Sequence, residues 1–295
     1  MNETGTSTIT PTEAADVAAS LADTSEEHLS RPPVRVLSYE PGATLVRRRE
    51  AFRPVYEAIV ARIGRPTLLG GSAHGPDIRW RDEDRLVVLS GDIRGVTLSV
   101  HVTQEREEDE YRAFEWGGAW SADERHDFDS LPYLWQLYRN GPGEGLTVWP
   151  GGRLAACWEH FESALALMAG AWAEQLPVQI PGDWATFSIR DSRGSSYLSV
   201  HHTPEEGLGI HLNPRGEQDA PEDDMRARGW QTLDNGRWTA SFPDTRPDAP
   251  AALARLAVAE LRAQGVTELD ELTAGDISAN DYGHFWLPGL GITTR

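Results

Sequence analysis

The sequence contains no lysine and a single cysteine, and each shortage excludes a class of chemistry. All 27 basic side chains are arginine, which excludes Schiff-base catalysis and the lysine-dependent phosphate loop of nucleotide hydrolases. The one cysteine, Cys157, cannot form an internal disulfide or a cysteine-rich metal site. Because Cys157 adjoins an apolar helical stripe, we expect it to be a small buried residue and not a nucleophile.

Positive charge is also scarce in this chain. It carries 46 acidic side chains against 27 arginines, and its formal net charge is −19. Nucleic-acid binding depends on neutralising phosphates, and no segment long enough to fold is basic, so we expect no nucleic-acid partner. The small cluster Arg47-Arg48-Arg49 is interpreted as solvated surface, with a functional role as the alternative. The strong negative charge favours solubility and a basic partner.

Long apolar runs are missing as well. The longest uncharged apolar stretch, residues 163–173, is too short to cross a bilayer. The N-terminal segment lacks the cationic and apolar parts of a secretory signal and is rich in Thr, Ser, Ala and acidic residues. We therefore predict a disordered acidic tail over residues 1–33, no membrane association and a cytoplasmic location.

The sequence does contain an ordered series of elements, which is clearest in residues 151–295. Apolar side chains spaced three and four apart predict a helix with one apolar stripe, made of Trp158, Phe161, Leu165, Met168 and Trp172. We expect this stripe to cover a sheet, with a dimer seam as the alternative. Three short strands are predicted after it, over residues 184–189, 196–200 and 207–212.

A hairpin and a closing helix complete this half. Asn235-Gly236 stands between two strand-like runs, and both residues accept the positive φ angles that a tight hairpin turn requires. The closing helix is predicted to begin near Pro250, to include Leu261 and to end before Gly265. The late segment over residues 285–289 is expected to be a C-terminal strand or strap.

The first half repeats part of this order. Its helical stripe consists of Phe52, Val55, Tyr56, Ile59 and Ile63. Strands are predicted next over residues 77–80, 85–89 and 95–100. The similarity suggests a divergent internal repeat. The sequence thus predicts an α+β fold of two similar helix, three-strand, hairpin and helix modules with mainly antiparallel sheets, over residues 34–150 and 151–295.

Candidate catalytic and metal sites are weak. The segment 70–74 lacks the glycine that a nucleophile elbow requires at its last position, so we interpret it as a turn before a strand. Two clusters contain metal-ligating residue types: His126, Asp127 and Asp129, and His201 and His202 with Glu205 and Glu206. Adjacent histidines on a strand point to opposite faces and cannot bind one ion together. We predict a protein that is not an enzyme, with no catalytic residue, metal or cofactor; a metal-assisted hydrolase using His126 is the enzymatic alternative.

Aromatic residues form the more suggestive group. The chain has eleven tryptophans, and several aromatic side chains cluster outside the predicted elements. The candidate binding residues are Tyr111, Phe114, Trp116, Trp120, Tyr133 and Trp135. They either fill the joint between the two halves or form a recognition groove, since Trp and Tyr dominate binding hot spots.

The order of elements over residues 158–265, with Gly229-Trp230 before the hairpin and Trp238 within it, resembles YbjN-related proteins and type III secretion chaperones. The whole chain, through residues 114–120, 131–135 and 286–291, also resembles an uncharacterised Streptomyces-type family of actinobacterial cytoplasmic proteins. The first resemblance implies an acidic, usually dimeric module that holds an extended protein segment without a cofactor or catalysis.

The functional hypothesis that follows is a non-enzymatic protein- or peptide-binding module of chaperone or adaptor type. Its partner would be a protein or peptide client, for which basic residues would complement the negative charge, and the chain would act as a monomer or a homodimer. The alternative within the interaction class is an immunity protein that neutralises a basic toxin, for which the same negative charge is suited.

Overall fold

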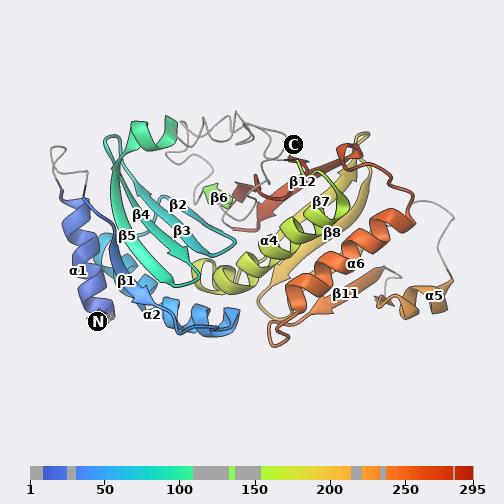
Figure 1. Cartoon of the computed structure of the whole chain (residues 1–295), viewed down its shortest axis with the longest axis horizontal. Helices are drawn as coiled ribbons and strands as arrows, with labels where there is room; N and C mark the ends of the chain where they lie inside the picture. The colour runs from blue at the N-terminus through green and yellow to red at the C-terminus, as the bar shows by residue number, and fades with distance from the viewer. Residues whose placement is uncertain are drawn as a thin grey trace, which may run out of the picture.

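The computed structural model describes residues 9–24, 31–108, 133–136, 154–213, 221–232, 237–281 and 283–294. It confirms a mixed α+β fold in which nearly all strand pairs are antiparallel. The strands follow one path in the order β1-β5-β4-β3-β2-β6-β13-β12-β7-β8-β9-β11-β10, and β14 pairs with β12. Helices cover this sheet on the left and the right of Figure 1. Within the described residues, no helix has the length and apolar character needed to cross a bilayer.

The first half consists of β1 (Val34–Ser38), α2 (Leu45–Ile63), β2 (Leu68–Ser72), β3 (Gly75–Arg81), β4 (Arg85–Asp92) and β5 (Gly95–Val102). The three strands predicted from sequence correspond to β3, β4 and β5, which pair in succession. Two strands were not predicted, β1 and β2, and they extend the sheet at either side of this meander.

The second half has more elements. After β6 (Tyr133–Gln136), a further unpredicted strand that still belongs to the first half, they are α4 (Trp158–Gln179), β7 (Ala185–Asp191), β8 (Ser196–Thr203), β9 (Gly207–Leu212), α5 (Glu222–Ala227), β10 (Gln231–Thr232), β11 (Trp238–Phe242), α6 (Ala249–Ala263), the 3-10 turn Leu269–Glu271, β12 (Leu272–Ala279), β13 (Gly283–Trp286) and β14 (Thr293–Thr294). The predicted strands match β7, β8 and β9. The predicted hairpin is confirmed by the pairing of β10 with β11, although its Asn235-Gly236 turn lies outside the described residues.

The segment predicted to be a disordered tail contains a helix. α1 (Pro11–Ala22) begins with a capping box in which Thr10 and Glu13 exchange hydrogen bonds. Its face of small apolar residues, including Ala14, Ala18 and Leu21, is buried and packs against α2. The predicted tail therefore does not extend over residues 11–22. The composition did not indicate this helix because alanine, which dominates its buried face, is neither strongly apolar nor polar.

The two predicted modules share one hydrophobic core. Strand β6 lies between β2 of the first half and β13 of the second, so the sheet is continuous through the joint. Helix α4 contacts both halves and runs across the middle of the molecule in Figure 1. Its predicted apolar stripe does cover a sheet: the Trp172 ring meets the Phe187 ring of β7 edge-on, with 5.5 Å between centroids.

The C-terminal part of α4 is polar and buried, and it connects the halves. Gln179 accepts a hydrogen bond from the Gly70 backbone N–H (2.9 Å) and donates one to the Gly70 carbonyl (2.8 Å). One turn earlier, Gln175 donates to the Ser72 carbonyl (3.2 Å). A Cβ atom on Gly71 would lie 1.7 Å from Gln175 Oε1 and 2.9 Å from the Gly75 carbonyl oxygen, so a larger residue would displace Gln175 from this position. The interpretation of residues 70–74 as a turn before a strand holds for residues 73 and 74, which precede β3, and is wrong for residues 70–72, which are strand residues that let α4 come close.

Replacing Gln179 with leucine is expected to lower the free energy of unfolding by about 2–4 kcal/mol, because two buried backbone groups of Gly70 lose these hydrogen bonds. Urea denaturation with an unchanged dependence on denaturant would measure this loss. The exposed Gln104→Leu variant is the control and should stay within about 0.5 kcal/mol of the unmodified protein. Equal stability of the two variants would contradict the joining role of Gln179.

Candidate functional site

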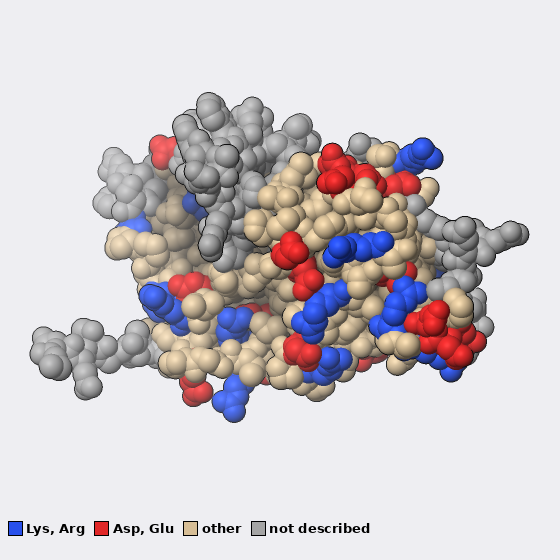
Figure 2. Space-filling view, turned by 45° about the vertical axis from the view of Figure 1, so that its right-hand side comes forward, with Lys and Arg blue, Asp and Glu red and all other residues tan. Residues whose placement is uncertain are grey.

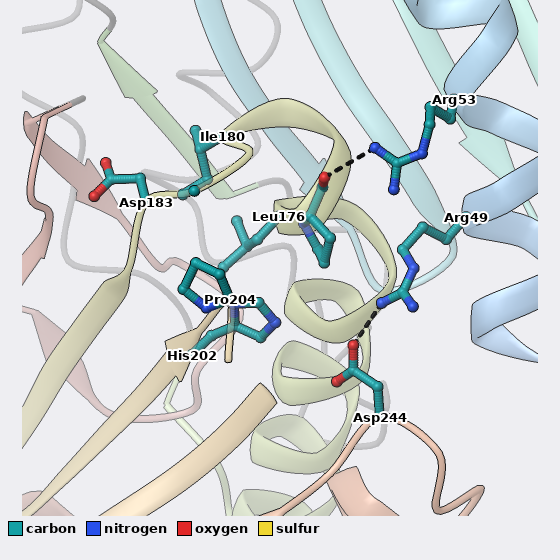
Figure 3. A pocket seen from close by; sticks show the side chains of 10 residues that line it. Arg49, Arg53, Leu176, Ile180, Asp183, His202, Pro204 and Asp244 are labelled. Carbon is teal, nitrogen blue, oxygen red and sulfur yellow. Dashed lines mark hydrogen bonds and ion pairs between the residues drawn. The ribbon is translucent and has the colours of Figure 1, made fainter. Parts of the chain in front are cut away.

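A pocket of about 170 Å³ opens where the two halves meet. Figure 3 shows its walls, which come from α2, the end of α4, strand β8 and the segment between β11 and α6. The lining residues are Arg49, Arg53, Leu176, Pro177, Ile180, Gly182, Asp183, His202, Pro204 and Asp244. Residues far apart in the sequence thus build one site.

Helix α2 supplies the two arginines, which lie one turn apart on the same face. Arg49 Nη1 donates to Asp244 Oδ2 (2.5 Å) and to the Ala173 carbonyl (3.1 Å). Arg53 Nη1 donates to the Pro177 carbonyl (3.2 Å). Both acceptors lack a helical partner: the Ala173 carbonyl faces Pro177, which has no N–H, and the Pro177 carbonyl lies in the last turn of α4, where cations are also favoured.

The predicted solvated cluster of residues 47–49 is only partly solvated. The Arg47 side chain is 74% exposed, whereas the side chains of Arg48 and Arg49 are 11% and 14% exposed. Arg48 pairs with the buried Glu174 at 2.6 Å, and Arg49 pairs with Asp244. The interpretation as surface is wrong for these two residues, because each has an acidic partner on a distant element.

His202 forms the floor of the pocket. It alternates with Leu198 and Val200 on the face of β8 that points toward the helices, and it is 2% exposed. Neither of its ring nitrogens has a hydrogen-bond partner among the described residues. Burial lowers the pKa of His202 to about 4, with Arg49 lowering it further and Asp244 opposing the shift. The ring is therefore neutral near pH 7 and offers one donor and one acceptor.

Asp244 presents a second polar atom without a partner. Its Oδ2 binds Arg49, but its buried Oδ1 has no hydrogen-bond partner among the described residues. Gly207, at φ +75°, makes room for this carboxylate, since a Cβ atom there would lie 2.8 Å from Oδ1. In contrast, both carboxylate oxygens of Asp183 are occupied by the backbone N–H groups of Trp184 and Asp281. Asp183 thus has a structural role in the pocket wall, while Asp244 Oδ1 is available to accept a hydrogen bond from a ligand.

The remaining walls are largely apolar. Leu176, Ile180 and Pro204 provide surface against which an aliphatic group can pack. Among the described residues that line the pocket there is no serine, threonine or cysteine to supply a hydroxyl or thiol nucleophile. The arrangement can hold a ligand by hydrogen bonds to His202 and Asp244 and by apolar contact.

No known protein family, characterised protein or solved structure matches this chain. The resemblance to YbjN-related proteins and to secretion chaperones accordingly stays a prediction. The function is therefore inferred from the geometry of the pocket.

Most of the residues predicted to bind or to act cannot be placed. Tyr111, Phe114, Trp116 and Trp120 lie outside the described residues, as do His126, Asp127 and Asp129. The other two predicted binding residues are in β6, where Tyr133 pairs with Gly71, and Trp135 pairs with Leu69 and Phe285. Their backbone thus belongs to the strand at the joint between the halves.

The histidine pair of β8 separates as its strand position predicts. His202 faces the pocket, whereas His201 stacks on the ring of His211 in β9, with 4.4 Å between centroids. A Cβ atom on Gly209 would lie 2.2 Å from His201 Nε2, so the ring occupies the space above that glycine. Among the described residues, no group of three or more His, Cys, Asp or Glu side chains is arranged to hold a metal ion.

Proposed function

We propose that the protein is a non-enzymatic binding protein and that its ligand inserts a small polar group into the pocket at the joint. The observation that supports this most directly is His202, a buried lining residue whose two ring nitrogens, like the nearby Asp244 Oδ1, have no hydrogen-bond partner among the described residues. Buried polar groups in folded proteins are nearly always hydrogen-bonded, and leaving one unsatisfied costs about 1–3 kcal/mol. A bound group that completes these hydrogen bonds recovers that cost.

The size of the pocket limits what it can hold. A volume of about 170 Å³ falls below the roughly 300–1,000 Å³ of pockets for drug-sized ligands. This size suits a small polar molecule or one amino-acid side chain better than a nucleotide. The pocket is therefore compatible with a small molecule and with a residue of a protein client.

The surface charge bears on the alternative of an immunity protein. On the face shown in Figure 2, acidic and basic side chains of the described residues alternate and do not segregate by sign. An inhibitor that covers a basic active site is expected to present a continuous acidic area to it. This face therefore favours recognition through the pocket over recognition through a charged surface.

A screen of small polar fragments by ligand-observed NMR would test the proposed function. We expect fragments that bind the unmodified protein and the Arg47→Glu control with similar affinity, and whose affinity changes at least tenfold, in either direction, in Arg53→Glu. Both variants reverse one charge on α2, but only Arg53 lines the pocket. Circular dichroism would verify that both are folded. Absence of any fragment that distinguishes Arg53→Glu from the control would overturn the proposal.

A further inference from the structure

We infer that the group recognised by the pocket is a primary ammonium on a short aliphatic chain. The inference rests on the proposed function and assigns its ligand class. It is drawn from the charges around the pocket, from the two unpartnered acceptors and from the apolar walls.

The charges around the pocket disfavour an anion. Two arginines, Arg49 and Arg53, face it, but both also contact Glu50, at 3.3 Å and 3.5 Å. Arg49 is in addition paired with Asp244, and Asp183 adds a third carboxylate to the surroundings. Among the lining residues two carboxylates balance two guanidinium groups, and Glu50 adds an exposed carboxylate beside both arginines. The pocket thus has no net positive charge to attract an anion, and the net charge of −19 draws cations toward the protein.

The unpartnered atoms suit a donor with several N–H groups. Asp244 Oδ1 is an acceptor, and one ring nitrogen of the neutral His202 is another. An ammonium group carries three N–H donors and no acceptor, so it can bond both atoms at once. Its hydrogen bond to the carboxylate would be charge-assisted and therefore stronger than a bond between neutral groups.

The apolar walls suit the chain that carries the ammonium. Leu176, Ile180 and Pro204 line the cavity beside His202, as Figure 3 shows. Four or five methylene groups can pack there while the ammonium reaches Asp244, and each buried methylene contributes about 0.8 kcal/mol. This chemistry belongs both to free alkylamines and to the side chain of lysine in a client protein.

Three isosteric probes separate the ligand classes: n-pentylamine, 1-pentanol and pentanoate are a cation, a neutral alcohol and an anion of nearly the same size. We expect isothermal titration calorimetry at pH 7 to detect n-pentylamine and to give affinities at least tenfold weaker for the other two. Equal or tighter binding of 1-pentanol or pentanoate would overturn the ligand class but leave the proposed function standing. Failure of all three probes, together with a fragment screen without hits, would overturn both.

A matched pair of variants tests the site itself. Asp244→Asn keeps the shape and an acceptor for Arg49 but removes the charge, and we expect n-pentylamine to bind it at least tenfold more weakly. The control Asp248→Asn makes the same change four residues later on an exposed side chain and should bind like the unmodified protein. Unchanged affinity in Asp244→Asn would overturn the assignment of Asp244.

The source of the ammonium is tested with Nα-acetyl-lysine N-methylamide, which presents a lysine side chain within a peptide-like backbone. Affinity within threefold of that of n-pentylamine would support a lysine of a protein client. Affinity more than tenfold weaker would support a free alkylamine. Both results support the ammonium, and each identifies one source.

Discussion

Replacing Arg48 with methionine is expected to lower the free energy of unfolding by about 3–5 kcal/mol at pH 8.5. Arg48 Nη2 donates to Glu174 Oε2 at 2.6 Å, and the Glu174 side chain is 2% exposed. Without Arg48, the Glu174 carboxylate would stay buried with no compensating charge. Burial already raises the pKa of Glu174 to about 7, against the opposing effect of Arg48. At pH 5.5 the loss should be smaller, because Glu174 can then take up a proton.

The double variant Arg48→Met/Glu174→Leu is the matching experiment. Replacing a buried ion pair by apolar residues of similar size is often neutral or stabilising, so we expect this variant to lie within about 1 kcal/mol of the unmodified protein. Urea denaturation of both variants at the two pH values would measure the effect. A double variant as unstable as Arg48→Met would show that the loss arises from packing and not from the uncompensated carboxylate.

Acidification from pH 7 to pH 4 is expected to reduce the stability by about 3 kcal/mol. Burial lowers the pKa of His201 to about 4, with His211 and His202 adding to the shift, and burial lowers that of His202 to about 4. In the unfolded chain both titrate near 6.5, so the unfolded state binds protons first as the pH falls. The stability that these histidines confer is complete above pH 6.5 and is lost toward pH 4, by about 3 kcal/mol each.

Glu174 acts in the opposite direction. Its folded-state pKa of about 7 lies above the unfolded value of 4.5, so the folded protein takes up the proton first and gains stability as the pH falls through that window. The gain is about 3 kcal/mol, which offsets one histidine but not two. The net effect of acid should therefore be destabilising.

Urea midpoints at pH 7, 5.5 and 4.5 would measure this dependence. His201→Gln is expected to remove about half of the histidine contribution, and His284→Gln, which changes an exposed histidine, is the control. Stability that holds constant or rises toward pH 4.5 would contradict the assignment of His201 and His202 as neutral buried groups.

Local patterns in the sequence predicted the elements whose formation depends on local spacing. The stripe from Trp158 to Trp172 gave α4, and the runs around Asn235-Gly236 gave the paired strands β10 and β11. Burial of Arg48 could not be predicted in this way, because its partner is 126 residues away in the chain. The strand role of Gly70 likewise depends on Gln179, at a separation of 109 residues.

The candidate site shows the same difference between features set by local spacing and features set by contacts between distant residues. Its one local signal was His202, a polar residue in register with the apolar Leu198 and Val200. Arg53 and Asp244 carry no such signal, since charged residues are abundant in this chain and only the fold shows which of them meet. The aromatic residues that drew attention in the sequence lie mainly outside the described part of the chain.

The position of β6 in the sheet determines when its strand pairing can be completed during translation. This strand is translated well before β13, yet it depends on β13 for one of its two neighbours. Until residues 283–286 have left the ribosome, β6 presents an open edge of N–H and carbonyl groups, the kind of edge that pairs readily with other chains. A stop codon after Asn280 would remove β13 and leave β6 in place. We therefore expect the truncated chain to aggregate through the open edge of β6, in the first half of the protein.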